Sequence, residues 1–206
     1  IRREIPEARV GLSGSQNPTS WNGYDWWKLM HAIDHLSGYG GVQTALQRSF
    51  LQPGTFYTTF LGYDYSDSDE QSARSRLWEL LFNGANGVNY YTMVSHSLNC
   101  PLLLDDGSLT RKAHWFFEEL AEIKSGLGRL FIEGKPGRDG VAIHYSPASL
   151  HVATARGLAD PRQKRRAFGM NLTNLSKALA DSHAHFEFLH EEQLCAGKLS
   201  EYKILF

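Results

Sequence analysis

The chain has 206 residues, of which 42% are hydrophobic and 21% are charged, a composition typical of one large or two small globular domains. Its 21 basic and 22 acidic side chains give a formal net charge of −1, which argues against a nucleic-acid or membrane partner, because both surfaces attract proteins with a basic excess. The two cysteines and nine histidines show no metal-ligand spacing, so neither a metal site, a cofactor nor a disulfide framework is expected, and no apolar run reaches the roughly 18 residues that a transmembrane helix needs.

The first two-thirds of the sequence predict β-strands that alternate with helices. The expected strands cover residues 9–13, 35–39, 55–61 and 88–93. Helices are expected over about 24–33, 67–82 and 110–131, and a short helix or a loop joins the second strand to the third. Such alternation predicts parallel strands, in either an open doubly wound sheet or a closed barrel. Long aromatic loops after the strands favour a barrel.

A joint between two domains is predicted at Gly134-Lys-Pro-Gly137, because beyond it the pattern of strands and helices starts again. Strands are expected over residues 140–145, 185–189 and 201–206, with a helix over 167–182. The last strand coincides with the end of the sequence, so no helix follows that could cover it, and we expect the second domain to be cut short. The predicted domains are residues 1–134 and 138–206.

Several short segments are similar, in chain order, to one family of sugar-cleaving enzymes. They are Ile1-Arg-Arg-Glu-Ile-Pro-Glu-Ala-Arg-Val10, His35-Leu-Ser-Gly-Tyr39, Gly84-Ala-Asn-Gly-Val-Asn-Tyr-Tyr91, Asp106-Gly-Ser-Leu-Thr110, Val141-Ala-Ile-His-Tyr-Ser146 and Tyr202-Lys-Ile-Leu-Phe206. Together they resemble the β-galactosidases of glycoside hydrolase family 42. The resemblance implies an α/β fold with about strands five to eight of a (β/α)₈ TIM barrel, followed by a truncated flavodoxin-like domain of the kind that mediates trimerisation in that family.

The resemblance also implies retaining chemistry, which needs two carboxyl groups about 5 to 5.5 Å apart. The family's acid/base Glu follows the fourth barrel strand, which lies upstream of this chain, so no residue here is expected in that role. Its nucleophile Glu ends the seventh strand, where this chain has Gly62 or Tyr63 instead. Three readings stay open: Asp64 replaces the Glu, Glu70 supplies the carboxylate from the following loop, or hydrolysis has been altered or lost.

Candidate sugar-binding residues fall at or just past the ends of the predicted strands. They are Gln16, Trp21, Tyr39, Arg48, Tyr63 and Tyr91. Trp21 and Tyr39 are expected to stack on the apolar faces of sugar rings, and Gln16 and Arg48 to hydrogen-bond hydroxyl groups. Alternatively, Arg48 pairs with a surface carboxylate and the aromatic rings pack on loops. The family has Trp and Arg where this chain has Met93 and Val94, so the same sugar pocket is not implied.

Three classes of function compete. The first is a glycoside hydrolase that acts on a carbohydrate substrate, as a homo-oligomer by resemblance. The second is a non-catalytic sugar-binding or assembly module that kept the barrel and lost the carboxylate. The third is a free-standing flavodoxin-like domain, which would need a glycine-rich phosphate loop after the strand at 140–145, where the chain offers Ser146-Pro-Ala-Ser149.

Overall fold

The computed structural model describes residues 3–15, 24–39, 42–62, 69–94, 101–135, 137–157 and 167–206. By their contacts these residues form two compact units. The first unit comprises Ile1–Ser15, His35–Gly40 and Phe56–Lys135, and the second comprises Gln16–Asp34, Gly41–Thr55 and Pro136–Phe206. Within the described ranges, no helix has the length and apolar character needed to cross a bilayer.

The first unit is built on a four-stranded parallel sheet. Its strands are β1 (Gly11–Ser15), β2 (His35–Gly38), β3 (Phe56–Leu61) and β4 (Gly87–Tyr90), in the spatial order β1-β2-β3-β4. Each strand therefore pairs with the next one in the sequence, as sequential strands in α/β folds commonly do. The prediction of consecutive parallel strands is confirmed, with boundaries within about two or three residues of those expected.

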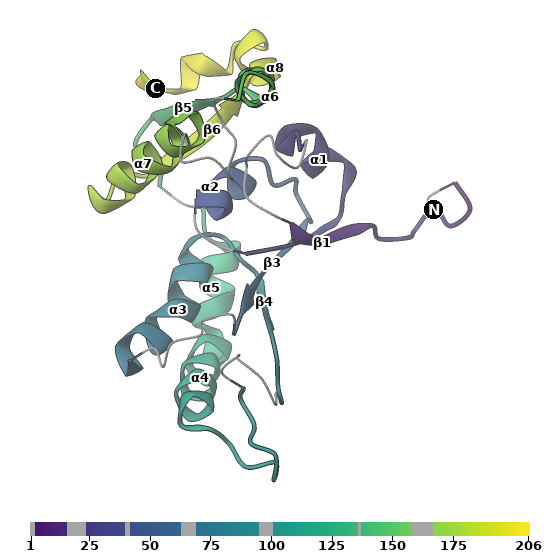
Figure 1. Cartoon of the computed structure of the whole chain (residues 1–206), viewed down its shortest axis with the longest axis vertical. Helices are drawn as coiled ribbons and strands as arrows, with labels where there is room; N and C mark the ends of the chain where they lie inside the picture. The colour runs from purple at the N-terminus through teal and green to yellow at the C-terminus, as the bar shows by residue number, and fades with distance from the viewer. Residues whose placement is uncertain are drawn as a thin grey trace. The chain divides into compact units, whose positions relative to one another are not determined.

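Helices α3 (Glu70–Phe82), α4 (Arg111–Glu122) and α5 (Gly128–Glu133) all lie on one side of this sheet (Figure 1). The Asp69 side chain accepts a hydrogen bond from the Ser72 N–H and so begins α3, and Thr110 begins α4 in the same way through Ala113. The single helix predicted over 110–131 is interrupted by a π-helical turn, η2 (Ile123–Leu127). Gly126 lies there at φ 136°, a conformation that ends regular helix.

The second unit contains a three-stranded parallel sheet in the order β6-β5-β7. Its strands are β5 (Val141–Tyr145), β6 (Phe186–His190) and β7 (Ile204–Leu205), so the strand predicted over 201–206 is shorter than expected. Helices α6 (Pro147–Ala155), α7 (Ala167–Asp181) and α8 (Glu191–Cys195) connect them, with a 3₁₀ turn, η3 (Lys198–Glu201). Helix α6 lies where the sequence pattern predicts none; Ser146 caps it and Pro147 occupies its first turn.

Two helices from early in the sequence also belong to the second unit. They are α1 (Trp26–Ala32) and α2 (Val42–Ser49). The Trp26 N–H lies 3.3 Å from the Tyr145 hydroxyl oxygen at the end of β5, and the Phe188 N–H donates to Ser49 Oγ at 2.9 Å. Trp26 and Phe50 are fully buried. These helices therefore complete the core of the second unit, although they lie between strands of the first in the sequence.

Candidate active site on the first sheet

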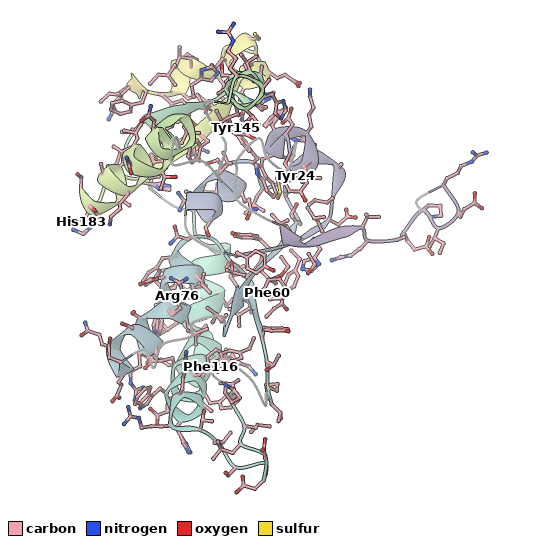
Figure 2. The ribbon with its side chains drawn as sticks, viewed as in Figure 1. Tyr24, Phe60, Arg76, Phe116, Tyr145 and His183 are labelled. Atoms are coloured by element: carbon pink, nitrogen blue, oxygen red, sulfur yellow. The ribbon has the colours of Figure 1, made fainter. Side chains whose placement is uncertain are left out.

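The two faces of the first sheet differ in character. On one face, Leu36 and Tyr57 are fully buried, and Tyr90 packs edge-on against Phe116 of α4 with ring centroids 5.2 Å apart. On the other face, His35, Ser37, Thr58 and Asn89 form what we call the polar face. Figure 2 shows Phe60 at the strands and Phe116 among the helices. Since side chains alternate along a strand, Phe60 shares the polar face with Thr58.

Hydrogen bonds join the polar face across three strands. The Asn89 side-chain Nδ2 of β4 donates to Thr58 Oγ1 of β3 at 2.9 Å and to Ser37 Oγ of β2 at 2.6 Å. The Thr58 hydroxyl in turn donates to the Leu36 carbonyl at 3.4 Å, and His35 Nε2 lies 3.3 Å from the same hydroxyl oxygen. Ser37 and Thr58 are almost fully buried, so this network fixes their hydroxyl groups in place.

An aromatic pair lies at the carboxyl end of the same face. The rings of Tyr39, which follows β2, and Phe60 of β3 stack with centroids 5.4 Å apart and planes inclined by 29°. A Cβ atom placed on Gly14 of β1 would lie 3.6 Å from the Tyr39 hydroxyl, so the phenol extends over the backbone of the neighbouring strand. A flat aromatic surface beside fixed polar groups is the combination that binds a sugar ring, whose faces are apolar and whose edges carry hydroxyls.

The end of β3 is closed to side chains at Gly62. Its φ is +91°, and a Cβ atom there would lie 2.0 Å from the carbonyl oxygen of Tyr91. The Tyr91 N–H also donates to the Leu61 carbonyl at 2.8 Å, which draws the two strand ends together. Position 62 therefore has no room for a carboxylate side chain.

The structure places only part of the predicted site. Tyr39 and Tyr91 lie at the carboxyl ends of β2 and β4 in the first unit, and Tyr91 is 44% exposed. Arg48 lies instead on α2 of the second unit, where its Nη2 donates to the Phe186 carbonyl at 3.2 Å. Glu70 is the first residue of α3 and accepts from Arg74 Nε at 2.8 Å. Outside the described residues lie Gln16, Trp21, Tyr63 and Asp64.

The sequence interpretation missed Ser37, Thr58 and Asn89. The signal that could have found them is the alternation along β2 and β3, since Ser37 falls two residues before Tyr39 and Thr58 two before Phe60. Their convergence depends on the strand register, in which Ser37 pairs with Thr58 and Phe60 with Asn89.

A separate apolar groove of about 370 Å³ lies elsewhere in the first unit. Its lining includes Leu77, Leu80, Val88, Ile123 and Ile132, and it reaches Gly87 at the amino end of β4. This is the strand end opposite to Tyr91. In the described part of the chain, no cluster of three or more His, Cys, Asp or Glu side chains could hold a metal ion. The polar face and its aromatic pair are therefore the candidate site.

Comparisons with known proteins give matches at the level of structure. No protein-family model and no curated protein matches the chain. A catalytic mutant of Gan42B, a GH42 β-galactosidase from G. stearothermophilus, superposes with a TM-score of 0.68 at 16% identity over 99% of this chain. The β-galactosidase of the psychrophilic Marinomonas ef1 gives 0.64 at 12% identity over 91%. A GH5_18 protein from Streptomyces cattleya in complex with GlcNAc gives 0.52 at 10% identity over 84% of this chain and 48% of its own.

The chain spans about a third of the two β-galactosidase structures, 33% and 34% of their lengths. At these identities the likeness is one of fold. The resemblance to GH42 β-galactosidases that the sequence segments predicted is confirmed at that level.

Proposed function

We propose that this chain is part of a glycoside hydrolase that cleaves β-galactosides or closely related sugars with retention of configuration. The observation that carries the proposal is the stacked pair of Tyr39 and Phe60 beside the hydrogen-bonded polar face, at the carboxyl ends of parallel strands. In α/β barrels this is the end of the strands where active sites are built. The fold of the GH42 structures supports the same class of substrate.

The proposal assigns β1 to β4 to strands five to eight of a TIM barrel, with residues 1–134 as the barrel part, of which residues 16–34 and 41–55 group by their contacts with the second unit. Residues 138–206 are assigned to the beginning of a flavodoxin-like domain. The parallel order β1-β2-β3-β4 and the one-third coverage of the β-galactosidase structures support this assignment. A trimer is part of the same proposal, and light scattering on the purified protein measures it.

The acid/base Glu is proposed to lie outside these 206 residues, and Asp64 is proposed as the nucleophile. Gly62 supports this choice, because the Tyr91 carbonyl occupies the space that a side chain at position 62 would need. Glu70 is the weaker candidate, since its carboxylate accepts a hydrogen bond from Arg74. A nucleophile must be free to attack the anomeric carbon.

The test is an assay of the complete gene product that carries these residues, on a panel of chromogenic β-glycosides. We expect turnover of the galactoside, and NMR of the first-formed anomer reports whether configuration is retained. Asp64→Asn should lower kcat by on the order of a thousandfold. The control Asp106→Asn changes a turn carboxylate whose Oδ1 accepts from the Ser108 N–H, and should leave kcat unchanged.

Absence of turnover on every glycoside would remove the hydrolase proposal. Sugar binding without turnover, unaffected by Asp64→Asn, would favour the alternative of a lapsed barrel that acts as a carbohydrate-binding or assembly module. If Asp64→Asn still turns over the glycoside at the wild-type rate, the hydrolase proposal stands and Asp64 is not the nucleophile.

A further inference from the structure

We infer that Asn89 is a specificity-determining residue, whose side-chain carbonyl Oδ1 accepts a hydrogen bond from one hydroxyl group of the bound sugar. The inference rests on the proposed function, because it assumes a carbohydrate ligand on the polar face. It adds a named contact on β4, at a position where no catalytic carboxylate is expected.

The orientation of the Asn89 amide follows from its partners. The Thr58 hydroxyl has the Leu36 carbonyl at 3.4 Å to donate to, so its oxygen is available to accept from Asn89 Nδ2 at 2.9 Å. The group of Asn89 that faces Thr58 is therefore the NH₂. Its second hydrogen is donated to Ser37 Oγ. Both hydrogens of the amide are thus committed to the protein, and Oδ1 is the atom left to act on a ligand.

Oδ1 of Asn89 is the polar atom of this amide that the described part of the protein does not use. Among the described residues, no donor forms a hydrogen bond with this atom. Asn89 as a whole is half-buried. The amide cannot turn away to satisfy Oδ1 elsewhere without breaking two hydrogen bonds, so the acceptor is held in place before a ligand arrives.

The position of Asn89 matches that of a hydroxyl beside a stacked sugar ring. Asn89 pairs in register with Phe60, whose ring stacks on Tyr39. A ring placed on this aromatic pair would present its edge hydroxyls to the neighbouring strand. A fixed neutral acceptor distinguishes a sugar that carries the matching hydroxyl from an analogue that lacks it, because the unmatched acceptor stays without a partner after desolvation.

The test measures binding of methyl 1-thio-β-D-galactopyranoside and its monodeoxy analogues, whose sulfur linkage resists hydrolysis, to the complete gene product by titration calorimetry. Asn89→Leu removes the acceptor at similar volume, and Asn89→Asp keeps the acceptor but loses both N–H donors. We expect Asn89→Leu to weaken binding of the parent sugar roughly tenfold. Asn89→Asp should retain affinity within about threefold. The control Asn83→Ala, at the end of α3 where the amide donates to the Glu79 carbonyl, should match the wild type.

One monodeoxy analogue should bind the wild type and Asn89→Leu equally, because the hydroxyl that Asn89 recognises is then missing from both complexes. Equal losses for Asn89→Leu and Asn89→Asp would overturn the inference, since they would show that the N–H donors matter and the acceptor does not. Unchanged binding by Asn89→Leu would overturn it while leaving the proposed function standing. A wild-type protein that binds no galactoside would overturn both.

Discussion

Gly62 determines the geometry of the strand end from which a nucleophile is expected. Its φ is positive, and the Tyr91 carbonyl oxygen lies 2.0 Å from the point that a Cβ atom would occupy. Both features disfavour any residue other than glycine at this position. We expect Gly62→Ala to lower the free energy of unfolding by about 3 kcal/mol or more, the sum of left-handed backbone strain and the displacement of Tyr91. Urea unfolding followed by far-ultraviolet circular dichroism measures the change.

The matched control is Gly107→Ala in the same unit. Gly107 has a similar φ of +82°, but no atom lies within 4 Å of the point that a Cβ atom would occupy there. Only the backbone strain therefore applies, and Gly107→Ala should lower the free energy of unfolding by about 1 kcal/mol. Equal losses at the two positions would show that the approach of Tyr91 to Gly62 contributes nothing to stability.

The carboxylate of Glu119 on α4 binds two side chains of α3. Trp78 Nε1 donates to this carboxylate at 2.7 Å and Arg74 Nη1 at 2.8 Å, and these bonds, that of Trp78 first, hold the pKa of Glu119 below its ordinary value. A carboxyl group whose pKa is lower in the folded state stabilises the fold above the unfolded-state pKa of about 4.3. This stabilisation is lost as the pH falls through the lower, folded-state pKa.

Glu119→Gln should therefore unfold at lower urea concentration than the wild type above about pH 5, and the difference should vanish in stronger acid. Urea midpoints measured across this pH range give the result. Glu118→Gln is the control: Glu118 binds the same Arg74 but its side chain is 61% exposed, so its effect should be smaller at every pH. A difference in urea midpoint between Glu119→Gln and the wild type that does not change with pH would contradict a lowered pKa of Glu119 as its cause.

Among the elements, α2 protects the free edge of β6. Among the strands that the structure describes, the order β6-β5-β7 leaves one edge of β6 without a partner strand, and the last turn of α2 meets this edge. Arg48 donates to the Phe186 carbonyl, and the Phe188 N–H donates to Ser49 Oγ. Side chains of a helix thus satisfy backbone groups that would otherwise offer a template for another strand.

Ser49→Ala should destabilise the chain by about 1–2 kcal/mol, because the N–H of the buried Phe188 loses its acceptor. Ser49 Oγ also donates to the carbonyl four residues earlier, at 2.8 Å. Ser182, directly after the end of α7, donates in the same way to the carbonyl four residues earlier, at 2.8 Å, so comparison with Ser182→Ala isolates the contribution of the edge. Thermal unfolding should separate the two variants; coincident curves would remove the role of α2 at this edge.

The sequence predicted the longer elements well because their patterns were complete. Residues 55–61 are β-branched and aromatic and form β3, and residues 67–82 carry both a cap and an apolar stripe and form α3. The apolar stripe of the helix predicted over 110–131 continues past Gly126, so periodicity alone did not indicate that the helix is interrupted at η2. The polar face was missed because Ser37, Thr58 and Asn89 meet only through register between strands, which the pattern within one strand does not contain.

At the scale of the whole molecule, the two units do not follow chain order. Residues 16–34 and 41–55 group with residues 136–206, although strands of the first unit flank them in the sequence. An amphipathic pattern shows that α1 and α2 bury one face, but not which sheet receives that face. The packing partner of a helix is a property of the folded chain, and this part of the architecture had to come from the structure.

This grouping predicts the behaviour of a chain that ends at residue 135. Without β5 and β6, the side chains of Trp26 and Phe50, which are 0% and 1% exposed, lose their packing partners, each at a cost of about 2 kcal/mol. We expect amide hydrogen exchange to show α1 and α2 unprotected in the shortened chain, whereas α3 and α4, which pack on each other in the first unit, keep their protection. The intact chain under the same conditions is the reference. Protection of residues 26–32 and 42–49 in the shortened chain would mean that these helices pack stably without the second sheet, and the assignment of α1 and α2 to the second unit would have to be withdrawn.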